Sequence, residues 1–200
     1  MERVEARVYR LATPLGVWAA TFTDAGLREL RLPETLSQEG RQPRQGKGPI
    51  GNGAGPWLED REGEAGRRLT KLLSARLAGS RVDMPWEAFD LSGRPPFFVR
   101  AWQALHRIPF GEVRTYGQIA RVTGSPNAVR AVGQACGANP IVLFIPCHRV
   151  VAASGPGGFG AGLEWKRRLL ELEGHNLDSP GRCWPALTAW QRRACGCPLA

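Results

Sequence analysis

Long apolar runs are missing from this chain. No stretch approaches the ~20 consecutive apolar residues of a membrane-spanning helix, which argues against a transmembrane protein. The N-terminal residues Met1-Glu2-Arg3-Val4-Glu5 also lack the apolar core of a secretory signal. We therefore expect a protein of the bacterial cytoplasm or nucleoid, with no membrane partner.

Cysteine is scarce and odd in number: the chain has five, and three of them fall in the last eighteen residues. This arrangement does not resemble a secreted disulfide framework, and we expect reduced thiols. The pair Cys195-Gly196-Cys197 has only His175 and Cys183 as neighbouring ligands, which is short of a zinc-site pattern. We expect no metal and no cofactor.

Acidic residues are outnumbered, with 18 Asp and Glu against 27 Lys and Arg, which gives a formal charge of +9. Arginine exceeds lysine, and guanidinium matches phosphate geometry, so the composition suits a polyanionic partner. A GC-rich genome would produce the same bias. Charge therefore permits DNA binding without establishing it.

The first part of the chain predicts a small sheet-and-helix domain over residues 1–92. Residues 4–32 have the pattern of β-structure, with a hairpin turn at Asp24-Ala25-Gly26. Residues 33–56 are rich in Gly, Pro, Gln and Arg and indicate a mobile surface loop. An amphipathic helix follows, and its helically spaced leucines predict core positions: Leu69, Leu72, Leu73 and Leu77.

Residues 93–175 predict a second, mostly helical domain after a break at Leu91–Pro96. Phe98, Trp102 and Leu105 share one face of its first helix. The next helices predicted are Tyr116 to Val122, Pro126 to about Cys136, and Leu163 to Glu173. Ser125 is the expected N-cap of the middle one, which begins at Pro126. Two helices joined by a short turn indicate a helix-turn-helix, and residues 176–200 indicate a poorly ordered tail.

The reactive motif is Pro146-Cys147-His148-Arg149, which follows the apolar run Ile141–Ile145. We expect that run to be a buried strand that holds the thiol on a rigid support. A neighbouring imidazole can accept the thiol proton, and the thiolate is the reactive form of cysteine. A Cys-His hydrolase is the weaker interpretation, because those enzymes bring their histidine from a distant part of the chain.

Four further blocks accompany this motif between about Phe97 and Gly174. They are Gly111-Glu112-Val113-Arg114-Thr115-Tyr116, Arg130-Ala131-Val132-Gly133, Asn139-Pro140 and Glu171-Leu172-Glu173-Gly174. In this order and spacing, the five blocks resemble the O6-alkylguanine-DNA alkyltransferases, which repair DNA. The resemblance implies an α/β (α+β) fold, with a ribonuclease H-like N-terminal domain and a winged helix-turn-helix-like C-terminal domain.

The resemblance also implies a reaction. An alkyl group, typically methyl, would move irreversibly and once per molecule from O6-alkylguanine or O4-alkylthymine in DNA to Cys147. His148 would take the thiol proton through a water, and Glu173 would orient the imidazole. Tyr116 would donate a proton to the leaving guanine. Asn139 would tie the recognition helix to the active-site strand.

DNA binding follows from the same resemblance, because a base inside a duplex must be flipped out to reach a buried thiol. The second motif helix would lie in the minor groove, where little sequence is read, and Arg130 would fill the vacated stack. Small residues there allow close approach to DNA, or alternatively tight helix packing. The implied DNA-binding residues are Thr115, Tyr116, Ser125, Arg130, Ala131 and Gly133. The implied alkyl pocket is formed by Pro146, Val150, Gly158, Phe159 and Gly160.

The expected partner is thus double-stranded DNA that carries O6-alkylguanine, bound by a monomer that can act cooperatively on DNA. One alternative is an alkyltransferase-like protein that binds lesions and recruits other repair factors without transfer, although such proteins replace the acceptor cysteine. Another is a helix-turn-helix protein that binds one DNA sequence.

Overall fold

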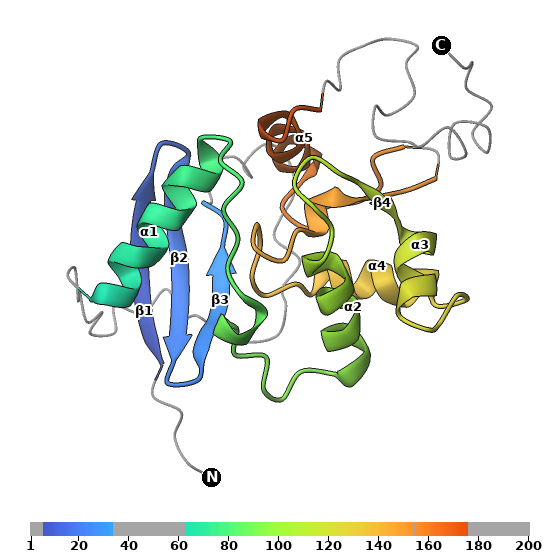
Figure 1. The fold of residues 1–200 in the computed structure, drawn as a ribbon, viewed down its shortest axis with the longest axis horizontal. Coiled ribbons are helices and arrows are strands. Elements are labelled where there is room, and N and C mark those ends of the chain that lie inside the picture. Colours follow the sequence, from blue (N-terminus) through green and yellow to red (C-terminus); the bar gives the residue numbers. More distant parts are fainter. Residues whose placement is uncertain (1–5, 34–62, 154, 176–200) are drawn as a thin grey trace.

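The computed structural model describes residues 6–33, 63–153 and 155–175. The expected mobile loop, apart from its first residue, and the expected tail lie outside the described residues. Strands β1 (Arg7–Thr13), β2 (Gly16–Thr23) and β3 (Gly26–Arg31) form an antiparallel sheet in the order β1-β2-β3. Helix α1 (Glu64–Leu77) lies across one face of this sheet (Figure 1).

The sheet buries alternate residues, as the period of a strand requires. Tyr9 and Leu11 of β1 and Trp18 and Ala20 of β2 are buried. Helix α1 comes close to β1 at Gly66, where a Cβ atom would lie 2.8 Å from the Tyr9 ring. The predicted hairpin is confirmed, and β2 and β3 are joined by the turn that ends at Gly26.

The C-terminal half is mostly helical. It contains α2 (Pro96–His106), α3 (Tyr116–Val122), α4 (Val129–Gly137) and α5 (Leu163–Leu172), and a single-turn helix, η2 (Trp86–Ala88), precedes them. A short 3-10 turn, η3 (Cys147–Arg149), leads into β5 (Val150–Val151), which pairs in parallel with β4 (Arg114–Thr115). The predicted helices at 116–122 and 163–173 are present, the second ending one residue earlier than expected.

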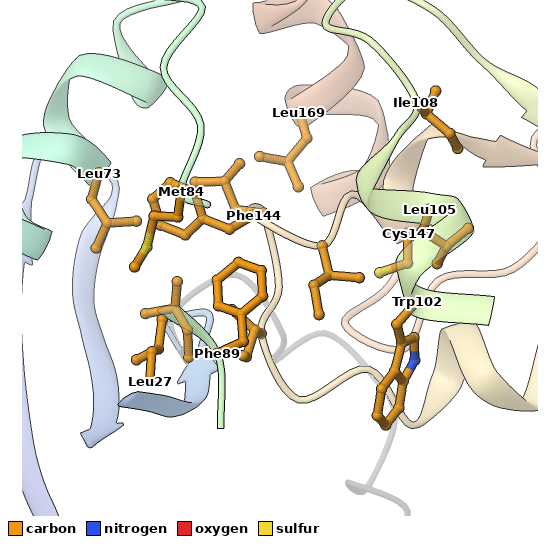
Figure 2. Packing of buried hydrophobic residues seen from close by; sticks show 14 of the residues in the cluster. Leu27, Leu73, Met84, Phe89, Trp102, Leu105, Ile108, Phe144, Cys147 and Leu169 are labelled. Atoms are coloured by element: carbon orange, nitrogen blue, oxygen red, sulfur yellow. The ribbon is translucent and has the colours of Figure 1, made fainter. Parts of the chain in front are cut away.

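The two halves share one hydrophobic core. Trp18 of the sheet and Trp165 of α5 make an edge-to-face contact, with ring centroids 6.1 Å apart. The Leu30 N–H donates to the Pro140 carbonyl at 2.8 Å. Figure 2 shows this cluster from Leu27 and Leu73 across to Cys147. Because these contacts cross residues 92–93, the division into domains there stays a prediction from the sequence.

Two expectations about local structure are wrong. The run before Cys147 is a tight turn and not a strand: Leu143 has φ 81°, and the Ile145 N–H donates to the Ile141 carbonyl at 2.9 Å. The apolar side chains are buried as expected, but a turn buries them as well as a strand does, so the pattern could not separate the two.

The helix predicted from Pro126 begins instead at Val129, after its N-cap Ala128. Residues 125–128 form a turn closed by the Ala128 N–H on the Ser125 carbonyl at 2.9 Å. Proline at the second position of such a turn is as favourable as proline at the start of a helix, which explains the error.

Among the described residues, no helix has the length and apolar character to cross a membrane. Within the same ranges, no group of three or more His, Cys, Asp or Glu side chains is placed to hold a metal ion. Cys183, Cys195 and Cys197 lie outside the described residues.

Candidate active site

Cys147 lies at the start of the η3 turn, inside the core and 5% exposed. Its backbone N–H donates to the Ile145 carbonyl at 2.8 Å, which fixes the turn that presents the thiol. Burial raises the pKa of the Cys147 thiol, while a hydrogen bond from Asn139 and the charge of Lys166 act in the opposite direction. The environment thus disfavours a thiolate overall but supplies two groups that stabilise one.

Asn139 follows the end of α4 and connects that helix to the thiol. Its Nδ2 donates to the Ile145 carbonyl at 2.7 Å and to the Cys147 sulfur at 3.1 Å. Its Oδ1 accepts from the Ile141 N–H at 3.1 Å. One side chain therefore holds both the apolar turn and the sulfur.

His148 is fully buried and faces the carboxylate of Glu173, which is the C-cap of α5. The His148 Nε2–H donates to Glu173 Oε1 at 2.9 Å. The other ring nitrogen, Nδ1, has no hydrogen-bond partner among the described residues. A carboxylate on Nε2 fixes the imidazole tautomer that leaves Nδ1 free to accept a proton.

The Glu173 carboxylate is held by arginines as well as by the imidazole. Arg149, 1% exposed, donates from Nε to Oε2 and from Nη2 to Oε1, both at 2.8 Å. The Gly111 N–H donates to Oε2 at 3.2 Å, and Arg76 of α1 approaches Oε1 at 3.3 Å. These contacts supply hydrogen bonds and positive charge to a carboxylate in the core, where an unpaired one would be costly.

Tyr116 begins α3 and faces the glycine-rich loop after β5. Its hydroxyl donates to the Gly158 carbonyl at 3.3 Å. Burial raises the pKa of Tyr116 to about 12, so the phenol keeps its proton at neutral pH. Gly157, with φ +70°, packs against the same ring, where a Cβ atom would lie 2.8 Å from a ring carbon. The loop and the phenol therefore fix one another.

Lys166 is a residue that the sequence reasoning missed. It lies on the buried face of α5, 1% exposed, and its Nζ donates to the carbonyls of Val150 and Pro156 at 2.5 Å each and to that of Gly158 at 3.2 Å. Burial lowers the pKa of Lys166 to about 8. The sequence signal that could have identified Lys166 is its position on the helix, directly after Trp165 and three residues before Leu169, both of which are buried. Lys166 ties the loop to β5 and puts a positive charge near Cys147.

The structure places the predicted pocket residues around this loop. Pro146 and Val150 are buried beside Cys147, and Phe159 packs against the core cluster, while Gly158 and Gly160 are exposed. Cys136 of α4 packs on the same cluster, and burial raises its pKa to about 12.

The predicted DNA-binding residues lie on and before the two motif helices. Thr115 and Gln118 form a capping box on α3: the Thr115 hydroxyl accepts from the Gln118 N–H at 3.2 Å, and the Thr115 N–H donates to the Gln118 side chain at 2.7 Å. Arg130 is exposed on α4, and Ala131 is half-buried. Ser125 is in the turn before α4 and is not its N-cap.

Gly133 of α4 is the position that separates the two interpretations of its small residues. A Cβ atom there would have no neighbour within 4 Å. Close packing within the described part of the chain therefore does not require glycine at this position.

Comparison with known proteins gives a consistent result. The family model for the DNA-binding domain of 6-O-methylguanine DNA methyltransferase matches residues 96–175. A methylated-DNA–protein-cysteine methyltransferase of Mycolicibacterium paratuberculosis is 40% identical over 162 residues, which are 80% of this chain and 88% of the relative. The same enzyme of Mycobacterium leprae is 47% identical over 122 residues, 60% of this chain and 72% of the relative.

Solved structures agree with the sequence matches. The crystal structure of Mycobacterium tuberculosis O6-methylguanine methyltransferase has a TM-score of 0.63 and 35% identity, covering 84% of this chain and 93% of that one. The structure of the Mycobacterium tuberculosis protein in complex with DNA has a TM-score of 0.62 and 36% identity, covering 84% and 92%. The mixed arrangement of a small antiparallel sheet and helices is common to these folds.

Proposed function

The chain belongs to the methylated-DNA–protein-cysteine methyltransferase family, and we propose that it repairs DNA by transferring an alkyl group from O6-alkylguanine to Cys147. The observation that carries the proposal is the buried thiol of Cys147, with Asn139 on its sulfur and the His148–Glu173 pair beside it. The product is a thioether, which is chemically inert, so each molecule acts once. The same thiol would accept an alkyl group from O4-alkylthymine.

The transfer is a displacement at saturated carbon. The Cys147 sulfur forms a bond to the alkyl carbon, the bond from that carbon to the guanine oxygen breaks, and its electron pair leaves with the guanine. The thiol proton goes first to His148 Nδ1 through a water molecule. Glu173 then stabilises the imidazolium through Nε2. The Asn139 hydrogen bond supports the negative charge on sulfur before the attack.

Guanine is a poor leaving group as an anion, so a donor near its ring should help. Tyr116 has this role in the proposal, because a phenol is protonated at neutral pH and its hydroxyl can donate a hydrogen bond to the developing anion. The alkyl group itself would lie against the residues beside the thiol and the glycine-rich loop: Pro146, Val150, Gly158, Phe159 and Gly160.

DNA binding is assigned to the two motif helices. In the proposal, α4 lies in the minor groove with Arg130 inserted where the flipped nucleotide leaves the stack, and Ala131 and Gly133 allow the close approach. Thr115, Tyr116 and Ser125 would contact the backbone on the same side. The relative solved in complex with DNA supports DNA as the partner.

We also propose a fold for each domain and a state of the protein in solution. The N-terminal domain (1–92) would be ribonuclease H-like, and the C-terminal domain (93–175) would be a winged helix-turn-helix that carries the active site. The protein would be a monomer in solution that can bind DNA cooperatively.

Two alternatives are less favoured by the site. A lesion-binding protein without transfer has no use for an acceptor thiol, and Cys147 is present. A Cys-His hydrolase needs a direct bond from imidazole to thiol, whereas in the described structure His148 hydrogen-bonds to Glu173 and no hydrogen bond joins it to the sulfur.

The proposal is tested by incubating the protein with a duplex oligonucleotide whose single O6-methylguanine carries a labelled methyl group. We expect label on the wild-type protein and none on Cys147→Ser. The matched control is Cys136→Ser, which changes a second, half-buried thiol packed against the same core and should keep transfer. Transfer by Cys147→Ser, or its loss only in Cys136→Ser, would contradict the assignment.

A further inference from the structure

Arg76, in the last turn of α1, reaches the Glu173 carboxylate from the N-terminal half of the chain. Its side chain is 1% exposed, and its Nη2 lies 3.3 Å from Glu173 Oε1. The same oxygen accepts the Nε2–H of His148 at 2.9 Å. One carboxylate oxygen is therefore shared by a guanidinium and by the imidazole beside the acceptor thiol.

Glu173 does not need Arg76 to hold its position. Arg149 alone makes three contacts with the carboxylate, at 3.1, 2.8 and 2.8 Å, and the Gly111 N–H adds another at 3.2 Å. A carboxylate fixed by a two-pronged guanidinium and a backbone N–H is already oriented. What Arg76 adds is a second positive charge.

That charge is incompletely compensated. The guanidinium lies over the Phe110 ring, 4.6 Å from its centroid, and the carboxylate of Asp83 is 3.6 Å away but 57% exposed to solvent. Nε and Nη1 of Arg76 are buried and have no hydrogen-bond partner among the described residues. Such burial is costly, and an apolar side chain would fill the space without that cost.

We propose that Arg76 is a positioning residue which, through Glu173, limits how readily His148 takes the proton of Cys147. This inference rests on the proposed function. The carboxylate favours a charged imidazole, and each guanidinium on that carboxylate opposes it. Glu173 bonds directly to His148, and Arg76 of α1 and Arg149 of the η3 turn pair with that carboxylate. Cys147 precedes His148 in the η3 turn, and His175, after α5, interacts electrostatically with both His148 and Glu173.

The arrangement suits an acceptor that reacts once. A thiol that is permanently ionised would be lost to any small electrophile that reached it. With Arg76 in place, Cys147 keeps its proton more of the time, and reaction depends more strongly on the substrate in the pocket. By limiting how readily His148 takes the proton, Arg76 thus protects the acceptor thiol of Cys147 until the substrate is bound.

The test compares Arg76→Gln, which removes the charge, with Arg76→Lys, which keeps it. The first-order rate of methyl transfer is measured at saturating lesion-bearing duplex, together with the Kd for the same DNA. We expect transfer at neutral pH to be about three- to tenfold faster in Arg76→Gln and near the wild-type rate in Arg76→Lys, with Kd unchanged in both. Arg28→Gln is the matched control, because Arg28 pairs with Asp90 in the sheet domain and should leave the rate unchanged.

A second readout does not depend on alkyl transfer from DNA. The rate at which iodoacetamide modifies Cys147, followed by peptide mass, reports the availability of the thiolate, with Cys136 as the internal reference. We expect the Cys147 rate to rise in Arg76→Gln and not in Arg76→Lys. Equal effects of the two variants, or a slower rate in a folded Arg76→Gln, would overturn the inference. If the wild type transfers no methyl but this charge dependence appears, the proposed function fails and the inference about Arg76 stands.

Discussion

Cys147 stands in a site whose groups act on the thiol in opposite directions. Burial raises its pKa, while Asn139 and Lys166 lower it, and the His148–Glu173 pair offers a place for the proton. The same core holds a second thiol, Cys136, and burial likewise raises its pKa. Reactivity therefore depends on neighbours that can stabilise charge, because burial alone would leave both thiols inert.

Alkaline pH should destabilise the protein through these buried acids. The pKa of Cys136 rises from 9.0 to about 12 and that of Tyr116 from 10.0 to about 12, and the pKa of Cys147 rises as well. The folded state therefore keeps protons that the unfolded chain releases above pH 9, and stability is lost as pH rises. Lys166 acts oppositely between about 8 and 10.5, because its pKa is lowered on folding, but it is one group against two thiols.

We expect the free energy of unfolding of the reduced protein to fall by roughly 0.5–1 kcal/mol per pH unit above about pH 9. Urea denaturation at several pH values, followed by tryptophan fluorescence, measures this slope. Cys136→Ala should make this slope shallower. Below pH 10.0, the ordinary pKa of Tyr116, only the raised pKa of Cys147 then works against the lowered pKa of Lys166. An unchanged slope in Cys136→Ala would refute this link between the raised pKa of the thiol and the loss of stability at alkaline pH.

The residues of the site differ in how far the sequence revealed them. Cys147, His148, Glu173, Asn139 and Tyr116 were identified as candidates because they fall in motif blocks. Arg76 and Lys166 were missed for different physical reasons. Arg76 meets a carboxylate 97 positions away, and Lys166 bonds to backbone carbonyls, which every residue has. Neither a carboxylate that is distant in the sequence nor a backbone carbonyl can be predicted from the spacing of nearby residues.

At the scale of elements, α4 is the part of the fold that would meet DNA. It begins at Val129 after a turn, and its inner face packs through Val132 and Ala135. Arg130 is exposed, and Gly133 has open space where a side chain would lie. The helix thus presents the long, positively charged side chain of Arg130, and beside it Gly133 leaves the helix surface without a side chain.

Gly133→Ala separates folding from binding. Alanine in a helix interior is favoured over glycine, so we expect the free energy of unfolding to rise by about 0.5–1 kcal/mol. DNA affinity should fall severalfold, because the added methyl group holds the helix away from the groove. Thermal unfolding and fluorescence anisotropy measure the two effects. Gly117→Ala in α3 is the control and should leave affinity unchanged; unchanged affinity in Gly133→Ala as well would argue against close approach.

Arg130→Ala tests nucleotide flipping. The substitution should slow methyl transfer from duplex DNA by about tenfold or more and leave the reaction with free O6-methylguanine base nearly unchanged, because the free base needs no extrusion. Single-turnover rates on both substrates give the comparison. An equal loss on both would mean that Arg130 acts at the thiol or on folding.

The helices predicted at 116–122 and 163–173 are present, and each is followed closely by a glycine with positive φ, Gly124 or Gly174, a residue that favours the end of a helix. The start of α4 and the turn before Cys147 were not predicted, since Pro126 and the apolar run at 141–145 are each compatible with two structures. The β4–β5 pair joins two-residue strands whose sequences carry no periodic signal. Tertiary contacts decide such short elements.

At the scale of the whole molecule, charge and core have separate functions. The formal charge of +9 favours DNA of any sequence, and one continuous core connects the sheet to the turn that carries the thiol. The N-terminal half also supplies Arg76 to the carboxylate of the site. The sheet therefore belongs to the structural support of the chemistry.

Affinity for undamaged DNA should fall steeply with salt and depend little on sequence. Each phosphate contact releases counterions, so several contacts lower the affinity by about tenfold or more between about 50 and about 200 mM salt. Anisotropy titrations on duplexes of unrelated sequence measure both properties. A strong preference for one undamaged sequence would instead indicate a sequence-specific helix-turn-helix protein.

The central claim is that Cys147 accepts the alkyl group and that the reaction ends there. The direct measurement is the intact mass of the protein after incubation with excess duplex that carries one O6-methylguanine, followed by peptide mapping. We predict a gain of one methyl group per molecule, located on Cys147, with no further gain at longer times. An unchanged mass despite tight binding to the lesion, or a methyl group on another residue, would contradict the account.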